Sequence, residues 1–426
     1  MKVSPARKAA FEILNRIDST RAFSSVLLPE YEEHLPSNDR GLCHELVLGI
    51  LRRQIYLDRL IDHFTGAKRL DSAVRNALRL GAYQLRFLEK IPDYSAINES
   101  VNLVQMAKKT SAKGLVNAVL RRVSEQIPEM SFTDDVERVS VETSHPRWLI
   151  EKWIGDFGFD TAEQIAAANN KIPRTAFRST ALSKTPWPDY AKSPLVDGAY
   201  ISPSIDGRLR DLADAGEIYF QDEASQLVAN IAASDVGTRF LDVCAAPGGK
   251  TTLVAAAHED ALIAAGDLHS SRSKLLQATC ARQGVSFVNV VQYDAEANLP
   301  FASESFDTVL VDAPCSGTGT IRHNPEIRYF LEPGDFEDLA KKQRHILGNA
   351  SKVVRPGGRL IYSTCSIQTE ENEVVCREFL KETDHFEKVR PAVPADLLTA
   401  DDFARTFPHR DEMDGFFIAE FRRRIR

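Results

Sequence analysis

The chain has 426 residues, of which 43% are hydrophobic and 27% charged, and its net charge is −7. This length exceeds what one ordinary core holds, so two or three domains are expected, and the composition is that of a soluble globular protein. No apolar stretch reaches the roughly 20 residues that span a bilayer, and the N-terminus lacks the apolar segment of an export signal. We therefore expect no membrane partner and a cytoplasmic location.

Charge is distributed unevenly along the chain. Residues 1–130 carry a net charge of +5, and the remaining residues carry −12. A locally basic domain can contact phosphates even in an acidic protein, so nucleic acid is not excluded as a partner.

The six cysteines are dispersed and include no C-x-x-C pair. They fit neither a disulfide framework nor a structural zinc site, and we expect no metal. Cys43, Cys280 and Cys376 are predicted to be small buried hydrophobes.

Residues 1–128 show helical periodicity throughout. Ser4-Pro5 is a good helix start, and Ala9, Ile13 and Ile17 then recur at helical spacing. Five or more amphipathic helices with short connections predict a small bundle. Basic residues lie mostly off the apolar stripes, and Arg121 and Arg122 are candidates for RNA contact, although for any single one of them a solvated helix face is the simpler explanation.

The middle of the chain is mixed. Residues 129–145 are polar and aperiodic, which is consistent with a linker. Two helical stretches and two short strands follow within 146–235, and they suggest a small α+β module. The expected domains are residues 1–140, 141–235 and 236–426.

From about residue 236 strands and helices alternate, which predicts a parallel, doubly wound sheet. Ligands of such sheets bind at the carboxyl ends of the strands. Chemically useful residues fall at or just after five predicted strand ends: Asp242, Asp267, Asp294, Asp312, Cys315 and Cys365.

The turn "LDVCAAPGGKTT" fits neither common phosphate-binding pattern. A Walker loop requires glycine where Cys244 stands, and the dinucleotide fingerprint is absent. Small residues would let the main chain approach a nucleoside with a cationic tail. Asp267 stands where an acid accepts from ribose hydroxyls, and Asp294 could accept from an adenine amino group. S-adenosylmethionine has a ribose, an adenine and a positive sulfonium, and it has no phosphate. Alternatively, any one of these aspartates could be the cap of a helix.

Two thiols and an acid suit methylation of a pyrimidine at carbon 5. A thiolate that adds to ring carbon 6 makes carbon 5 nucleophilic, and an acid at ring nitrogen 3 eases the addition. A second group then removes the carbon 5 proton. Asp312, Cys315 and Cys365 supply this set, although spacing does not tell which thiol attacks. The base must be unstacked, which single-stranded or loop RNA allows most cheaply.

The motifs "DVCAAPGGKT", "DAPCSGTG" and "YSTCS" together resemble RNA 5-methylcytosine methyltransferases of the Nop2/Sun (RsmB) family. The N-terminal stretches "AVRNALRLGAYQL" and "GLVNAVLRR" resemble the NusB-type RNA-binding domain. This combination of motifs resembles the bacterial branch of the family, whose members act on 16S ribosomal RNA. The resemblance implies a NusB-like all-α bundle, then a small α+β module, then a Rossmann-like methyltransferase domain. It implies as target one cytosine of that RNA, position 967.

Roles follow from the resemblance at matching positions. Cys365 would be the nucleophile, Cys315 would assist product release, and Asp312 would bind the cytosine and border the cofactor. Lys250 would orient Asp312 or a thiolate. S-adenosylmethionine would be held by Cys244, Ala245, Ala246, Pro247, Gly248, Gly249, Lys250, Asp267, Asp294 and Asp312.

Other hypotheses stay open on the sequence. The same chemistry serves transfer RNA methyltransferases, and a non-catalytic RNA-binding factor would also carry the helical bundle. Arg322 and His323 are further candidates for RNA contact, or they belong to a surface loop. Nothing suggests an obligate dimer, so we expect a monomer.

Overall fold

The fold is described from a computed structural model, which covers residues 3–184 and 187–425. The chain forms two compact units. The helical unit comprises the residues up to Lys171 together with Ile321–Leu331, and the sheet unit comprises Ile172–Thr320 together with the residues from Glu332 onward.

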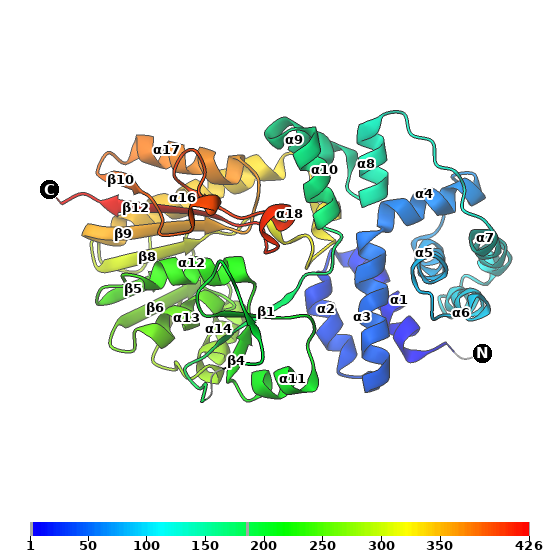
Figure 1. The fold of residues 1–426 in the computed structure, drawn as a ribbon, viewed down its shortest axis with the longest axis horizontal. Helices are drawn as coiled ribbons and strands as arrows, with labels where there is room; N and C mark the ends of the chain where they lie inside the picture. The colour runs from blue at the N-terminus through cyan, green and yellow to red at the C-terminus, as the bar shows by residue number, and fades with distance from the viewer. Residues whose placement is uncertain (1–2, 185–186, 426) are drawn as a thin grey trace. The chain divides into compact units, whose positions relative to one another are not determined.

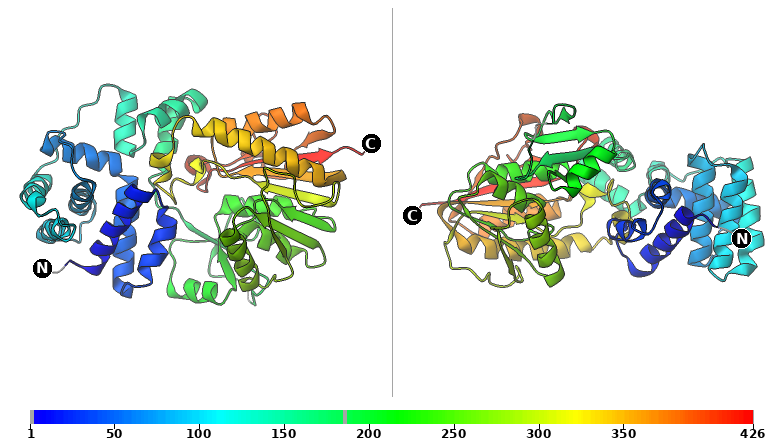
Figure 2. Two further views of the ribbon diagram at one scale, coloured as in Figure 1. Left: turned by 180° about the vertical axis from the view of Figure 1, so that it is seen from behind. Right: turned by 90° about the horizontal axis from the view of Figure 1, so that it is seen from below.

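The predicted helical bundle is confirmed. It contains α1 (Pro5–Thr20), α2 (Ser24–Glu32), α3 (Ser37–Arg52), α4 (Gln54–Thr65), α5 (Ser72–Phe87), α6 (Asp93–Met106) and α7 (Lys113–Glu125). Their apolar stripes meet in one core that holds Ile13, Leu46 and Leu78, and the bundle is drawn in blue to cyan in Figure 2. Helix α1 begins at Pro5 as predicted, but the Ser4 hydroxyl makes no capping bond and accepts from Arg7 Nη1 instead.

The expectation of a linker at 129–145 is wrong for most of its length, because α8 (Asp135–Thr143) lies there. Asp134 caps this helix by accepting from the amide of Glu137, and the side chains of Val139 and Val141 are buried. Two turns of helix are too short to show a clear periodicity in sequence. Helices α9 (Arg147–Phe157) and α10 (Phe159–Ala168) follow as predicted, and they belong to the helical unit.

The sheet unit opens with a small four-stranded antiparallel sheet in the order β2-β3-β1-β4. The predicted strands are β1 (Thr175–Ser179) and β3 (Ala199–Ser202), and they are joined by β2 (Ala191–Lys192) and β4 (Ile218–Phe220). Helix α11 (Gly207–Asp214) lies between β3 and β4 in the chain.

The predicted doubly wound sheet follows, in the order β10-β12-β9-β8-β5-β6-β7 (Figure 1). Its five parallel strands are the predicted ones: β5 (Arg239–Asp242), β6 (Leu262–Asp267), β7 (Asn289–Gln292), β8 (Phe306–Asp312) and β9 (Val354–Thr364). The end of the chain adds antiparallel strands, namely β10 (Phe386–Val389), β11 (Ala404–Arg405) and β12 (Phe417–Arg423).

Helices cover both faces of this sheet. Alternate residues of a strand point to opposite faces, and along β8 Leu310 joins one core while Val309 and Val311 join another. The first core includes α12 (Glu223–Ala233), α13 (Gly249–Ala257) and α14 (Ser270–Arg282). The second includes α16 (Asp335–Val353) and α17 (Val375–Glu382). Because the five strands are parallel, their carboxyl ends lie at one edge of the sheet, and ligands of such folds bind at this edge.

Candidate active site

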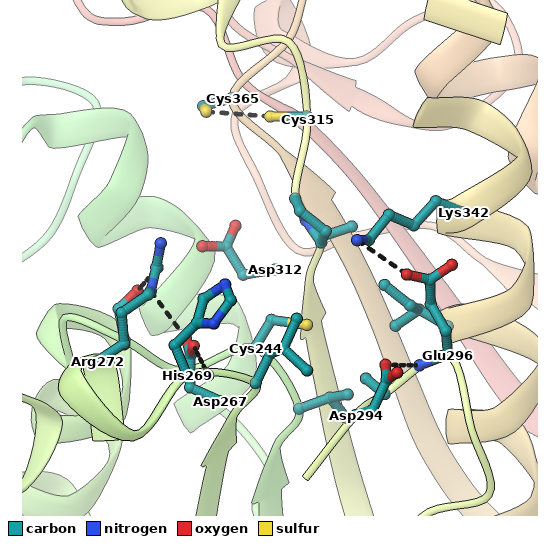
Figure 3. A pocket seen from close by; sticks show the side chains of 17 residues that line it. Cys244, Asp267, His269, Arg272, Asp294, Glu296, Asp312, Cys315, Lys342 and Cys365 are labelled. Carbon is teal, nitrogen blue, oxygen red and sulfur yellow. Dashed lines mark hydrogen bonds and ion pairs between the residues drawn. The ribbon is translucent and has the colours of Figure 1, made fainter. Parts of the chain in front are cut away.

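A cavity of about 390 Å³ opens at the carboxyl ends of the parallel strands (Figure 3). Seven of the residues singled out in the sequence line it: Cys244, Ala246, Asp267, Asp294, Asp312, Cys315 and Cys365. His269, Arg272, Glu296 and Lys342 line it as well, and sequence reasoning had not singled them out. Its volume lies in the range of small-molecule sites.

The turn from β5 to α13 forms one wall of the cavity. Its backbone is drawn toward the sheet because Ala245 N donates to Gly266 O at 2.7 Å. Gly248 has a φ of 109°, which favours glycine, and a Cβ there would lie 2.8 Å from Leu276 Cδ1. The other predicted cofactor residues of this turn lie beside the cavity rather than in its lining: Ala245, Pro247, Gly248, Gly249 and Lys250.

Asp267 and Asp294 bond the turns after their strands, and neither of them is the cap of a helix as the alternative interpretation supposed. Asp267 Oδ1 accepts from His269 N at 3.3 Å and Oδ2 accepts from Arg272 Nε at 3.1 Å. Asp294 Oδ1 accepts from Glu296 N at 2.9 Å. Each carboxylate thus shapes the turn after its strand, and each also lines the cavity. Figure 3 shows Asp267 and Asp294 on different sides of the cavity.

Asp312 ends β8 and is held at both oxygens. Lys250 Nζ lies 2.6 Å from Oδ2, and the Ser363 hydroxyl donates to Oδ1 at 2.7 Å. Burial opposes the charge on Lys250, but the charge and hydrogen bond of Asp312 outweigh it and raise the pKa of Lys250. The ammonium also lies 5.2 Å from the centroid of the Phe416 ring. Lys250 is therefore a cation at neutral pH, and it orients the Asp312 carboxylate.

The two thiols singled out in the sequence are in contact. Cys315 follows β8 and Cys365 follows β9, and their sulfur atoms lie 3.1 Å apart. The hydrogen bond with Cys365, then burial, then the charge of Cys365 raise the pKa of Cys315 well above the usual range of a thiol. Cys315 therefore stays protonated at neutral pH, and either thiol can donate the hydrogen bond between the two sulfur atoms.

The three other thiols predicted to be structural, Cys43, Cys280 and Cys376, are buried. Burial, followed by the charge of Asp242, raises the pKa of Cys244, so this lining thiol is protonated too.

The four candidates for RNA contact lie in the helical unit, outside the cavity. Arg121 and Arg122 are exposed on α7. Arg322 and His323 belong to the segment Ile321–Leu331, and Arg322 is 6% exposed, whereas His323 is half-buried.

Sequence reasoning missed two polar side chains that hold the site. Ser363 precedes the "TCS" motif by one residue and contacts Asp312. Glu371 lies in the acidic run "TEENE", a pattern typical of an exposed face, yet its side chain is buried. The only sequence signal was the short distance of both residues from Cys365.

The fold and this pair of thiols define the class of an RNA-modifying methyltransferase, and comparison with known proteins gives the same result. Residues 230–422 match the family described as 16S rRNA methyltransferase RsmB/F, and residues 4–125 match the NusB family. A probable ribosomal RNA small subunit methyltransferase B of Bacillus subtilis (strain 168) is 33% identical over all of both chains.

A ribosomal RNA small subunit methyltransferase B of Sodalis glossinidius is also 33% identical, over 97% of this chain and 96% of the relative. The crystal structure of PH0851 superimposes with a TM-score of 0.84 at 26% identity, and it covers 99% of each chain. The chain therefore belongs to the RsmB/F family of RNA methyltransferases, which confirms the resemblance noted in its motifs. The alternative of a non-catalytic RNA-binding factor is not supported.

Within the described residues, no helix combines the length and the apolar character that crossing a membrane requires.

Proposed function

We propose that this protein transfers a methyl group from S-adenosylmethionine to carbon 5 of a cytosine in 16S ribosomal RNA, through a covalent bond between Cys365 and the cytosine. The position that the motifs imply is cytosine 967. One observation carries the proposal: two thiols lie 3.1 Å apart at the strand ends, in a cavity that Asp312 also lines. Methylation of oxygen or nitrogen requires no thiol, whereas activation of a pyrimidine carbon uses one thiolate as nucleophile and a second group to remove the carbon 5 proton, and two thiols can supply both.

The lining of the cavity fits S-adenosylmethionine. Asp267 and Asp294 offer carboxylate oxygens to hydroxyl and amino groups, and the turn 244–250 brings backbone close to the cavity. Four carboxylates line the cavity, with Arg272 and Lys342 as the cations among its lining residues, and the excess of negative charge favours a ligand with a positive sulfonium over a phosphate. When bound, this cofactor supplies an electrophilic methyl group.

The protein residues perform the remaining chemistry. Cys365 sulfur adds to ring carbon 6, and Asp312, fixed by Lys250 and Ser363, binds the cytosine ring. The Lys250 ammonium beside it offsets the negative charge that develops on the ring. Carbon 5 then forms a bond to the methyl group. Removal of the carbon 5 proton expels Cys365 and restores the aromatic ring.

The thiol pair also suggests which group takes that proton. Cys365 is the first cause of the raised pKa of Cys315. Once Cys365 sulfur is bonded to carbon, it bears no charge and is a weaker acceptor. Cys315 then loses its proton more readily, and it becomes the base that removes the carbon 5 proton. Formation of the covalent intermediate thus makes Cys315 a better base for the step that breaks the intermediate down.

The helical unit is proposed to bind the RNA. It matches the NusB family, residues 1–130 carry a net charge of +5, and Arg121 and Arg122 are exposed on it. The two relatives described above are ribosomal RNA small subunit methyltransferases by name, which favours 16S RNA over transfer RNA. The proposal includes a monomeric enzyme that acts in the cytoplasm without a metal, and it assigns RNA binding to residues 1–140, RNA positioning to 141–235 and catalysis to 236–426.

Bisulfite sequencing of total RNA from a deletion strain tests the substrate. Unmethylated cytosine is deaminated by bisulfite, and 5-methylcytosine is protected. We expect one 16S cytosine to lose protection in the deletion strain and to regain it with the wild-type gene. Loss of protection in a transfer RNA instead would identify the alternative substrate, and unchanged protection everywhere would refute carbon 5 methylation.

A further inference from the structure

Glu371 is a buried carboxylate for which the mechanism above gives no role. It lies in a π-helical turn (η3, Glu370–Val374) that follows β9, and its side chain has 0% exposure. Turns of this kind are rare and frequently occur at functional sites. The hydroxyl of Tyr362, on β9, donates to the Glu371 carbonyl at 2.6 Å and fixes the turn on the sheet.

The Glu371 carboxylate joins the two turns that carry the thiols. Oε1 accepts from Ser316 N at 2.8 Å, and Oε2 accepts from the hydroxyls of Ser316 and Ser366 at 2.5 Å each. Ser316 directly follows Cys315, and Ser366 directly follows Cys365. One side chain is therefore bonded to both cysteine turns, which are 50 residues apart in the chain.

Gln343, on α16, completes the arrangement. Its Nε2 donates to Glu371 Oε1 at 3.0 Å and to Pro314 O at 2.9 Å, so it holds the residue before Cys315. All four donors are neutral, and only an ionised carboxylate can accept from all of them at once. A buried group satisfied in this way is rigid, because each broken bond leaves an unpaired polar atom.

We infer that Glu371 is a positioning residue, which sets the separation of the Cys315 and Cys365 sulfur atoms and thereby the breakdown of the covalent intermediate. The inference rests on the proposed function for its catalytic part only. The negative charge of Glu371 acts in the same direction, because it is among the causes that keep Cys315 protonated while Cys365 is free.

Glu371→Gln tests the inference, with Glu373→Gln as the matched control. Glu373 lies in the same turn, is 8% exposed and pairs with Arg405 Nη2 at 2.8 Å, away from the cysteine turns. Burial raises the pKa of both glutamates. If Glu371 acted only through general stability, the two variants would behave alike at equal loss of thermal stability.

The first readout requires no RNA. An azodicarboxamide oxidant takes two hydrogens from a thiol pair, becomes the hydrazine and leaves a disulfide, and mass spectrometry locates the bond. We expect Cys315–Cys365 disulfide formation to slow at least about 5-fold in Glu371→Gln and to change less than about 2-fold in Glu373→Gln. The second readout is turnover, where we expect kcat to fall roughly 10- to 100-fold in Glu371→Gln with both KM values nearly unchanged.

Equal behaviour of the two variants in disulfide rate and kcat would overturn the inference. Gln343→Met, which keeps the carboxylate and removes one donor, covers the case in which Glu371→Gln fails to fold. It should slow both processes in the same direction by a smaller factor, and wild-type values for it would contradict the inference. If the wild type forms no adduct with RNA, the proposed function fails, whereas the disulfide comparison still decides the role of Glu371.

Discussion

Asp242, at the end of β5, shows how burial at a single residue makes stability depend on pH. Its side chain is 1% exposed, and burial raises its pKa to about 7, although the Thr251 hydroxyl donates to Oδ2 at 2.7 Å. The charge of Asp312 adds to the shift. Between the unfolded pKa of 3.8 and the folded pKa of about 7, the folded protein binds the extra proton. Stability contributed by this group therefore falls as pH rises through that window.

Asp242→Asn is the corresponding test, because asparagine cannot ionise. As pH rises from 4 to 8, the wild type should lose up to about 4 kcal/mol of unfolding free energy relative to the variant. This corresponds to about 1.4 kcal/mol for each pH unit. Urea unfolding at several pH values measures this difference. A constant difference across the range would show that Asp242 keeps an ordinary pKa.

At this scale the sequence predicted the lining residues well and their partners poorly. Asp267, Asp312, Cys315 and Cys365 could be placed together because the carboxyl ends of parallel strands meet at one edge. The contact of Glu371 with Ser316 joins residues 55 positions apart, and its burial depends on how the turn after β9 folds back. Local patterns carry no information about such a fold.

Among the elements, the turn after β8 packs on the chain's C-terminal segment through two glycines. Gly319, in the 3₁₀ turn η2 (Thr318–Thr320), donates from N to Cys365 O at 2.9 Å, and Gly415 N donates to Gly319 O at 2.9 Å. A Cβ at Gly319 would lie 1.8 Å from Gly415 O. The glycines thus allow the turn after β8, the turn after β9 that carries Cys365, and the C-terminal segment to approach each other.

Gly319→Ala should separate these segments. We expect it to destabilise the protein by roughly 1–3 kcal/mol, as overpacking does, and to lower kcat, because Cys365 loses its neighbour. Gly348→Ala is the control, since a Cβ at this position of α16 meets open space and alanine favours a helix by about 0.5–1 kcal/mol. Thermal unfolding and turnover of both variants give the comparison. If Gly319→Ala and Gly348→Ala have the same thermal stability and the same kcat, the close approach of the segments at Gly319 contributes nothing to catalysis.

The elements themselves were predictable to different degrees. The five parallel strands were recognised because buried strands read as short apolar runs that alternate with helices. The position of β12 between β10 and β9 was not, because pairing of distant antiparallel strands leaves no local pattern. Helix α8 was missed because its two turns bury few residues.

For the molecule as a whole, each of the two compact units is built from segments that are not consecutive in the chain. The segment Ile321–Leu331 leaves the sheet unit six residues after Cys315 and belongs to the helical unit. There the side chain of Arg328 has 0% exposure, and its Nη1 donates to Thr143 O at 3.0 Å and to Asn170 Oδ1 at 2.9 Å. Burial lowers the pKa of Arg328 to about 10, so it stays charged at neutral pH. Removal of residues 1–128 would strip this segment of partners such as Ser24, whose amide donates to Glu326.

Arg328→Met should therefore weaken the helical unit selectively. The variant leaves the carbonyl of Thr143 and the side chain of Asn170 without their donor, which costs about 3 kcal/mol. Hydrogen exchange should accelerate in α8 to α10 and stay unchanged in β5, β6 and β8. Arg138→Met, at a half-buried arginine that pairs with the partly exposed Glu142 and Glu163, should change exchange little. Equal acceleration in both units would contradict a local role for Arg328.

The central claim is that Cys365 forms a temporary bond to the cytosine, and RNA that carries 5-fluorocytosine tests it most directly. Fluorine at carbon 5 cannot leave as a proton does, so the methylated adduct persists and migrates as a protein–RNA complex. We predict that the wild type and Cys315→Ala form this adduct and that Cys365→Ala forms none while it still binds S-adenosylmethionine in calorimetry. An adduct of normal yield with Cys365→Ala would contradict the account.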